Sequence, residues 1–216
     1  MSIRVLLADD HTVVRDGLEM MLDSEDSISV IGTATNGFEA IDNSKKLEPD
    51  VVLMDIAMPN MNGIEATYRI KEQNPDTKVL ILSMKYNKES VFRALKAGAI
   101  GYILKESASD EVVEAVKAAS ENKRFLSEKV DEIVIDSYLN EKEGPEEEDP
   151  LELLSSRERE VLQLVSEGQT NQQIANQLYI SEKTVGTYRS RLMNKLELDN
   201  ITELVKFAIK HNITDV

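Results

Sequence analysis

Short apolar runs alternate with helical patterns over the first 121 residues of the chain. The apolar runs read IRVLLAD, ISVIGTA, DVVLMD, KVLILS and GYILK. Between and after them, apolar residues recur at the spacing of one helix face in the segments 12–24, 37–47, 63–73, 88–97 and 109–121. Continuous apolar strands that alternate with helices are typical of a parallel sheet with helices on both faces. The pattern therefore predicts a five-stranded, doubly wound α/β domain over residues 1–122.

The pattern weakens over residues 123–150, which we interpret as a linker. Its first part, SEKVDEIVIDSYLNEK, can form a short helix. The following EGPEEEDP carries two prolines and a run of acids, so it has almost nothing to bury. Such a composition is typical of an exposed acidic loop.

Residues 151–216 show helical spacing throughout. Helices are expected over 156–167, 171–178, 182–196 and 201–211. Ser155 and Thr170 begin capping-box patterns, Ser181 is a candidate N-cap, and Gly168 is a candidate helix stop. The region is therefore expected to be a separate, all-α domain.

Composition excludes several kinds of chemistry. The 216 residues contain no cysteine, which removes disulfide and thiolate chemistry and fits a reducing cytoplasm. The two histidines, His11 and His211, are too few for a multi-histidine metal site. The sequence shows no signal peptide and no apolar run of membrane-spanning length. We therefore expect a cytoplasmic protein that does not engage a membrane.

The net charge of −15 is unevenly distributed along the chain. Residues 151–216 contain eight Lys and Arg against nine Asp and Glu, so the first 150 residues carry a charge of −14. Within residues 181–195 there are four basic residues and one acidic residue. Because a local basic stripe decides nucleic-acid binding and the global sum does not, DNA is a candidate partner.

Polar residues end four of the five predicted strands. The first strand ends in Asp9 and Asp10, the third in Asp55, the fourth in Ser83 and the fifth in Lys105. In a parallel sheet these ends share one edge, and open α/β sheets bind their ligands there. Taken singly, each residue has an ordinary explanation, such as a helix N-cap, a turn or a solvated lysine. Taken together, they predict a site.

Three carboxylates in one place repel one another and need more positive charge than Lys105 supplies. A hard divalent cation with oxygen ligands meets that need, and Mg²⁺ is the usual one where phosphate is handled. A carboxylate beside Mg²⁺, an ammonium and a hydroxyl suits attack on phosphorus and formation of an aspartyl phosphate. Asp55 is the best candidate nucleophile because its strand is central in the predicted sheet.

The motifs LLADDH…VRDGL, DVVLMDIAMPNMNG, VLILSM and KAGAIGYILK resemble those of the receiver domain of bacterial two-component response regulators, which has a flavodoxin-like fold. The resemblance covers about residues 3–121, with each motif in order. It implies that a histidine kinase phosphorylates Asp55. It also implies Mg²⁺ ligands from Asp9, Asp10, Asp55 and the backbone carbonyl of Ala57.

The same resemblance implies a switch. It implies that Ser83 is the hydroxyl that moves toward the phosphoryl group, that Lys105 is the ion-pair partner of that group, and that Tyr102 is the switch aromatic. Glu106 departs from the family pattern, in which proline is frequent directly after the lysine.

Two enzyme classes fit the motifs less well. Haloacid-dehalogenase-type phosphatases also use an aspartate after a strand, but they need a second acid two residues later, where this chain has Ala57. The sequence has no Gly-rich nucleotide loop, which argues against a nucleoside triphosphatase. We therefore expect no enzyme activity beyond self-phosphorylation and autodephosphorylation.

The segment LLSSREREVLQLVSEGQTNQQIANQLYISEKTVGTYRSRLMNKLEL resembles the helix-turn-helix of the NarL/FixJ, or LuxR-type, transcription factors. The resemblance covers about residues 151–211 and implies that helix 182–196 enters the major groove of DNA. Val185, Tyr188, Leu192 and Leu196 share the face of this helix that is expected to be buried. Candidate phosphate and base contacts are Lys183, Thr184, Thr187, Arg189, Ser190, Arg191, Asn194 and Lys195.

Three positions of this helix depart from the family. Gly186 and Ser190 stand where lysine is often found, and Tyr188 stands where histidine is frequent. The base contacts that are usual in the family therefore cannot be transferred to these positions, and the operator sequence does not follow from the resemblance.

The sequence thus predicts a phosphorylation-controlled transcriptional regulator that dimerises when phosphorylated. Helix 201–211 is a candidate dimer contact, because Leu204, Val205, Ala208 and Ile209 exceed what a small core demands. Two alternatives stay open: a phosphorylation-independent DNA-binding protein whose receiver serves only assembly, and a protein-binding adaptor whose helix-turn-helix has lost DNA. No motif identifies the kinase, the stimulus, the target genes, the sign of regulation or the dimer interface of the receiver.

Overall fold

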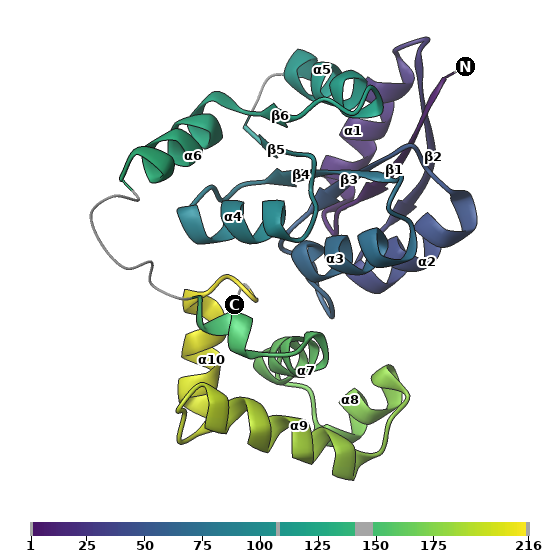
Figure 1. The fold of residues 1–216 in the computed structure, drawn as a ribbon. Helices are drawn as coiled ribbons and strands as arrows, with labels where there is room; N and C mark the ends of the chain where they lie inside the picture. The colour runs from purple at the N-terminus through teal and green to yellow at the C-terminus, as the bar shows by residue number, and fades with distance from the viewer. Residues whose placement is uncertain (1, 107–108, 141–148, 215–216) are drawn as a thin grey trace. The chain divides into compact units, whose positions relative to one another are not determined.

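The computed structural model describes residues 2–106, 109–140 and 149–214. The chain divides into two compact units, Met1–Gly144 and Pro145–Val216. Figure 1 shows that the first combines strands with helices, whereas the second is helical. None of the helices in the described part of the chain has the length and apolar content needed to span a bilayer.

The first unit is built on a six-stranded sheet (Figure 1). Its strands are β1 (Ile3–Ala8), β2 (Ile28–Ala34), β3 (Val51–Asp55), β4 (Lys78–Ser83), β5 (Gly101–Leu104) and β6 (Phe125–Leu126). They lie in the order β2-β1-β3-β4-β5-β6, and every neighbouring pair is parallel. The predicted parallel, doubly wound sheet is confirmed, but the expected number of five strands is wrong.

The sixth strand has no signal in the local pattern, because β6 is only two residues long. It forms because Phe125 and Leu126 pair with Gly101 and Tyr102 on β5. The backbone N–H of Ser127 adds a hydrogen bond of 3.0 Å to the Tyr102 carbonyl. A tertiary pairing therefore completes the sheet.

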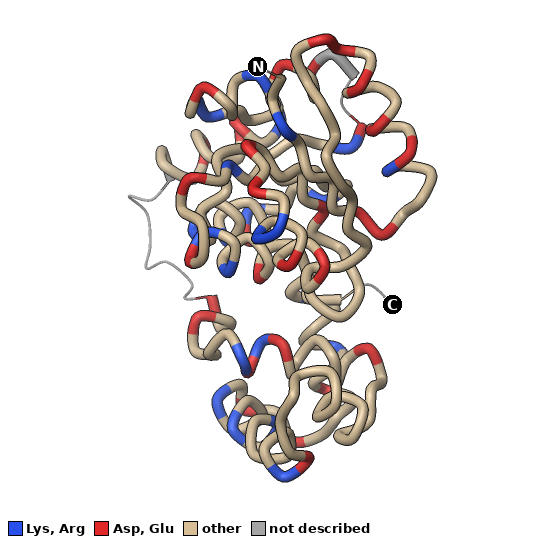
Figure 2. The backbone as a smooth tube through the Cα atoms, turned by 90° about the vertical axis from the view of Figure 1, so that its right-hand side faces the viewer, with Lys and Arg blue, Asp and Glu red and all other residues tan. Residues whose placement is uncertain are grey.

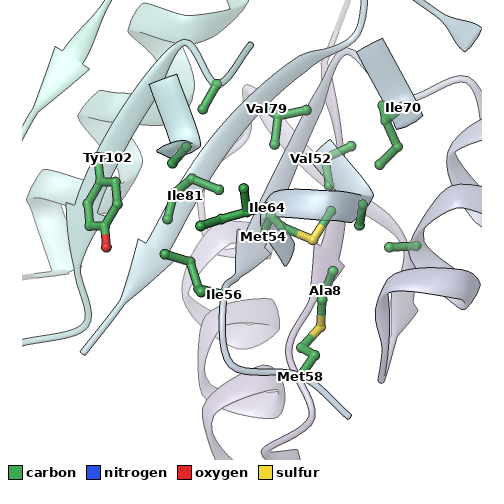
Figure 3. Packing of buried hydrophobic residues seen from close by; sticks show 14 of the residues in the cluster. Ala8, Val52, Met54, Ile56, Met58, Ile64, Ile70, Val79, Ile81 and Tyr102 are labelled. Carbon is green, nitrogen blue, oxygen red and sulfur yellow. The ribbon is translucent and has the colours of Figure 1, made fainter. Parts of the chain in front are cut away.

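Helices cover both faces of the sheet. They are α1 (Thr12–Asp23), α2 (Gly37–Leu47), α3 (Gly63–Gln73), α4 (Lys88–Lys96) and α5 (Ser109–Ser120). Helices α2, α3 and α4 pack on one face, and α1 and α5 pack on the other. Alternate strand residues point to opposite faces, so Val52 and Met54 join the first core (Figure 3), whereas Val51 and Leu53 join the second.

A further helix, α6 (Glu128–Asn140), also belongs to the first unit, although it lies in the segment assigned to a linker. Val130 is fully buried in the first core, and Val134 packs against that core. Helix α6 also packs against α4. The acidic loop expected after it falls largely on residues 141–148, which lie outside the described residues.

The second unit contains a 3-10 turn and four helices within its described residues. They are η1 (Pro150–Leu153), α7 (Ser156–Ser166), α8 (Asn171–Leu178), α9 (Glu182–Lys195) and α10 (Ile201–Lys210). Ser155 and Thr170 each complete a capping box, and Ser181 Oγ accepts the Thr184 N–H at 3.1 Å. Gly168, with φ +80°, follows the end of α7. The helix starts and the stop predicted from the sequence are confirmed.

Candidate functional site

The carboxyl ends of β1, β3 and β5 bring two acids and a lysine together. Asp55 ends β3 and Asp9 follows β1, and both are almost fully buried, at 3% and 2% exposure. Lys105 follows β5 and places its Nζ 2.8 Å from Asp55 Oδ2 and 2.7 Å from Asp9 Oδ2. The structure therefore joins three of the residues that the sequence assigned to one sheet edge.

Burial dominates the electrostatics of this cluster. It raises the pKa of the Asp55 carboxyl to about 6, although Lys105 acts in the opposite direction. For Lys105, burial acts to lower the pKa, but Asp55 and Asp9 outweigh it and raise the pKa above its ordinary value. One ammonium therefore compensates the carboxylates incompletely. A further cation would stabilise the ionised form of Asp55.

Asp10 and His11 complete an acidic cluster. One potential ligand atom from each of Asp9, Asp10, His11 and Asp55 lies within 4.8 Å of the others. His11 Nδ1 lies 2.8 Å from Asp10 Oδ1. The explanation of Asp10 as a helix cap is not realised, because His11 is the N-cap residue of α1. His11 is missing from the residues predicted for the site, and its position directly after the acid pair is the sequence signal for it.

The donor set of this cluster fits a hard divalent cation. Among the described residues, Asp9 Oδ2 and Asp10 Oδ1 are buried atoms without a well-directed hydrogen bond, although Lys105 and His11 approach them. Carboxylate oxygens are the ligands that Mg²⁺ prefers in proteins. The cluster therefore has the atoms and the excess negative charge that such an ion needs.

Ser83 and Tyr102 are linked through the loop that follows β4. Ser83 Oγ accepts a hydrogen bond of 3.1 Å from the backbone N–H of Lys85. The Tyr102 hydroxyl donates to the Lys85 carbonyl at 2.5 Å, and the residue is fully buried. Burial raises the pKa of Tyr102 to about 12, so its hydroxyl remains a donor at neutral pH. The backbone of Lys85 therefore connects the two predicted switch residues.

The loop between β3 and α3 passes close to Asp55. Ala57 is exposed, and a hydrogen bond from its backbone acts to lower the pKa of Asp55. Gly63 begins α3, and an ideal Cβ at this position would lie 1.9 Å from the Asp55 carbonyl oxygen. Only glycine therefore lets the start of α3 approach the end of β3 this closely.

Helix α9 exposes most of the side chains predicted to contact DNA. Val185 and Leu192 are fully buried on its core side. Thr184 and Arg189 are partly buried. The exposed predicted residues are Lys183, Thr187, Ser190, Arg191, Asn194 and Lys195. Figure 2 shows acidic residues spread over the first unit, whereas basic residues gather along part of the second.

Arg189 and Lys195, both predicted to contact DNA, bond to other elements of the second unit. Arg189 Nη1 donates to Asn171 Oδ1 at 2.6 Å and so ties α9 to the start of α8. Lys195 Nζ donates to Glu158 Oε2 at 2.7 Å and to the Leu153 carbonyl at 3.0 Å. Glu158 also completes the capping box of α7. Lys195 therefore joins the end of α9 to the start of α7, a structural role that the sequence pattern does not reveal.

We expect Lys195→Ala to lower the free energy of unfolding by about 1 kcal/mol, because it removes a hydrogen bond to a buried carboxylate. The salt dependence of DNA binding should not change. Arg191→Ala, on the exposed face, should instead reduce the magnitude of the slope of log K for DNA binding against log[salt] by about one. It should leave the free energy of unfolding unchanged. Chemical denaturation and DNA titrations at several salt concentrations measure both effects. A lower slope for Lys195→Ala would identify this lysine as a phosphate contact after all.

The predicted dimer contact on α10 needs a correction. Leu204 and Ala208 are fully buried, because α10 packs against α7 within the unit. These two residues are therefore core residues and are not free to form a dimer contact. Ile201 and Ile209 are the most exposed apolar residues of α10, at 43% and 42%, and Val205 is partly buried.

Two family models match the chain. A response regulator receiver domain matches residues 5–117, and the luxR family of bacterial regulatory proteins matches residues 152–208. The oxygen regulatory protein NreC of Staphylococcus carnosus is 37% identical, and the similarity covers 99% of this chain and 100% of NreC.

Solved structures of RcsB are similar to the chain as well. RcsB from Salmonella enterica serovar Typhimurium, bound to promoter P1flhDC in the presence of phosphomimetic BeF3⁻, is 28% identical with a TM-score of 0.60, covering 96% of this chain and 98% of that one. A structure of two RcsB dimers bound to two parallel DNAs is 28% identical with a TM-score of 0.59, covering 97% and 98%. Because both domains match in order and a relative is similar over its full length, the chain belongs to the two-component response regulators with a LuxR-type DNA-binding domain.

Proposed function

We propose that phosphorylation of Asp55 by a histidine kinase switches this regulator into a homodimer that binds operator DNA. One observation carries the proposal. The Asp55 carboxylate is buried at the end of a central strand, and Lys105 Nζ lies 2.8 Å from it and 2.7 Å from Asp9. A buried nucleophile with a fixed ammonium beside it suits phosphoryl transfer to Asp55.

In the proposed reaction, one carboxylate oxygen of Asp55 attacks the phosphorus of a phosphohistidine. The P–N bond breaks, and the imidazole, which carries a proton on its other ring nitrogen, leaves as the neutral ring. Lys105 Nζ, which now holds Asp55 and Asp9, binds a phosphoryl oxygen. Asp9, Asp10, Asp55 and the Ala57 carbonyl would hold Mg²⁺, which when bound neutralises charge on the phosphoryl oxygens.

The phosphoryl group would then change the loop after β4. Ser83 Oγ now accepts a hydrogen bond from Lys85 N–H and would turn to donate to a phosphoryl oxygen instead. Tyr102 holds the carbonyl of the same residue, Lys85, so the loop and the aromatic ring shift together. A shift between two discrete arrangements is the usual output of such a switch.

DNA binding would use the exposed face of α9. The helix carries four basic residues and one acidic residue, and its polar residues can reach phosphates and base edges in the major groove. RcsB binds DNA as dimers in one of the similar structures, which supports a dimer as the DNA-binding form of this chain. Ile201 and Ile209 are the most exposed apolar residues of α10 that such a dimer could use.

Two measurements test the proposal. Intact mass after incubation with acetyl phosphate and Mg²⁺ should show one added phosphoryl group, and chelation of Mg²⁺ should remove it. Footprinting on host DNA with phosphorylated and unphosphorylated protein should then find sites whose occupancy rises on phosphorylation. Equal occupancy in both states would indicate a phosphorylation-independent regulator. An absence of any footprint would indicate a protein-binding adaptor.

Gly186 gives a prediction about the DNA interface. An added Cβ at Gly186 meets no atom within 4 Å in the free protein. Gly186→Ala should therefore raise stability by about 0.5–1 kcal/mol, the ordinary helix-propensity gain. If the missing side chain lets α9 approach the DNA backbone closely, the same variant should bind its operator more weakly with little change in non-specific binding. Operator and random-duplex titrations separate the two effects, and unchanged operator affinity would rule out the close approach.

A further inference from the structure

One lysine on α6, Lys129, contacts the segments that follow β4 and β5, the strands that carry Ser83 and Tyr102. Lys129 Nζ forms an ion pair with Glu106, the residue directly after Lys105. The same Nζ lies 5.4 Å from the centroid of the Tyr86 ring, in the loop that begins after Ser83. The hydrogen bond to Glu106 raises the pKa of Lys129, so its ammonium stays charged at neutral pH.

The start of α6 is anchored firmly beside these contacts. Ser127 is buried, its Oγ accepts the Leu104 N–H at 3.2 Å, and it also donates to Glu111 on α5. Its own N–H bonds the Tyr102 carbonyl at 3.0 Å, and Val130 is fully buried in the core. The first turn of α6 is therefore fixed to β5. The Tyr86 contact can change without detaching the helix.

The Tyr86 loop is also the segment expected to move. Ser83 Oγ and the Tyr102 hydroxyl both bond the backbone of Lys85, which directly precedes Tyr86. If Ser83 turns toward a phosphoryl oxygen, this backbone is displaced and the Tyr86 ring moves with it. Glu106 follows β5, where pairing with β4 and β6 holds the backbone. Of the two Lys129 contacts, the one to Tyr86 is therefore the one that depends on phosphorylation.

We propose that Lys129 is a positioning residue through which the Tyr86 ring reports the phosphorylation state of Asp55 to α6, the helix that precedes the segment leading to the DNA-binding unit. The inference rests on the proposed function. In the unphosphorylated protein the ring and Glu106 together hold the ammonium. Phosphorylation withdraws the ring and loosens α6.

Hydrogen exchange measures this coupling directly. Amide exchange in residues 130–139 is compared between unphosphorylated protein and protein phosphorylated with acetyl phosphate and Mg²⁺. Intact mass verifies phosphorylation of every variant. In the parent, phosphorylation should speed amide exchange about two- to fivefold, the range expected for loss of an exposed cation–π contact. In Lys129→Met and Tyr86→Leu, exchange should be fast in both states and the ratio should fall to about one. Tyr86→Phe keeps the ring and should restore the parent ratio.

A second surface pair provides the control. Lys123 and Glu121 form an exposed ion pair at 2.6 Å just before β6, and Lys123→Met should leave the ratio at its parent value. A purely structural role of Lys129 would speed exchange equally in both states and preserve the ratio, which would overturn the inference. An unchanged ratio in Tyr86→Leu would overturn it too. If the parent takes up no phosphoryl group, the proposed function fails first and this inference fails with it.

Discussion

Asp55→Asn is expected to abolish phosphoryl uptake and, at the same time, to make the protein more stable at neutral pH. Uptake is lost because the amide is a poor nucleophile and carries no charge to bind Mg²⁺. The amide is nearly the same size as the carboxylate, so the packing at the end of β3 is kept. Intact mass after incubation with acetyl phosphate and Mg²⁺ should show no increment for the variant.

The gain in stability follows from the raised pKa. Burial raises the pKa of Asp55 from 3.8 to about 6. The folded state therefore holds this proton more tightly than the unfolded state does. Below about pH 4 the carboxyl is protonated in both states, so its ionisation does not affect the free energy of unfolding. Above about pH 6 it is ionised in both states, and the free energy of unfolding is lowered by the full amount. A difference of about 2 pKa units corresponds to about 3 kcal/mol, so the variant should gain up to about that amount at neutral pH without Mg²⁺.

Denaturation of parent and variant across the pH range measures this gain. The two stabilities should converge as the pH falls to about 4, where Asp55 is protonated in both states. Added Mg²⁺ should narrow the gap at neutral pH, because an ion that binds the folded parent stabilises it. Asp42→Asn, at an exposed position on α2, is the control and should label like the parent. A phosphoryl increment on Asp55→Asn would refute the assignment of Asp55.

Gly63→Ala is expected to destabilise the protein by about 3 kcal/mol and to slow labelling of Asp55 as well. A Cβ at Gly63 would lie 1.9 Å from the Asp55 carbonyl oxygen and 2.8 Å from its carbonyl carbon. Both atoms are backbone at the end of β3, so a rotamer change cannot relieve the contact. Either the end of β3 or the start of α3 must therefore shift, and we expect this shift to displace the Asp55 carboxylate relative to Lys105.

Gly17→Ala is the matched control, because an added Cβ at Gly17 on α1 meets no atom within 4 Å. It should raise stability by about 0.5–1 kcal/mol and leave labelling unchanged. Denaturation and the initial rate of phosphoryl uptake measure both variants. Parent-like stability and rate for Gly63→Ala would mean that the loop between β3 and α3 relaxes freely, so that its close approach to Asp55 has no importance for the site.

Local patterns in the sequence predict the elements and the main residues of the acidic cluster. Apolar runs of buried strands and helix starts at Ser155, Thr170 and Ser181 are local signals, and the structure has these elements with nearly the predicted bounds. The convergence of Asp9, Asp55 and Lys105 also follows from sequence, because parallel strands place their carboxyl ends at one edge.

Other features depend on contacts between residues distant in sequence, for which the sequence has no local signal. The strand β6 forms only because its two residues pair with β5. Helix α6 joins the receiver only because Val130 packs into its core. The position of Lys195 on its helix predicts a DNA contact, yet its ammonium donates a hydrogen bond to Glu158 on α7. The spacing of residues along the sequence predicts which of them lie on the same face of a helix or strand. Which partner a long charged side chain meets depends on residues distant in sequence, and folding alone brings those within hydrogen-bond distance.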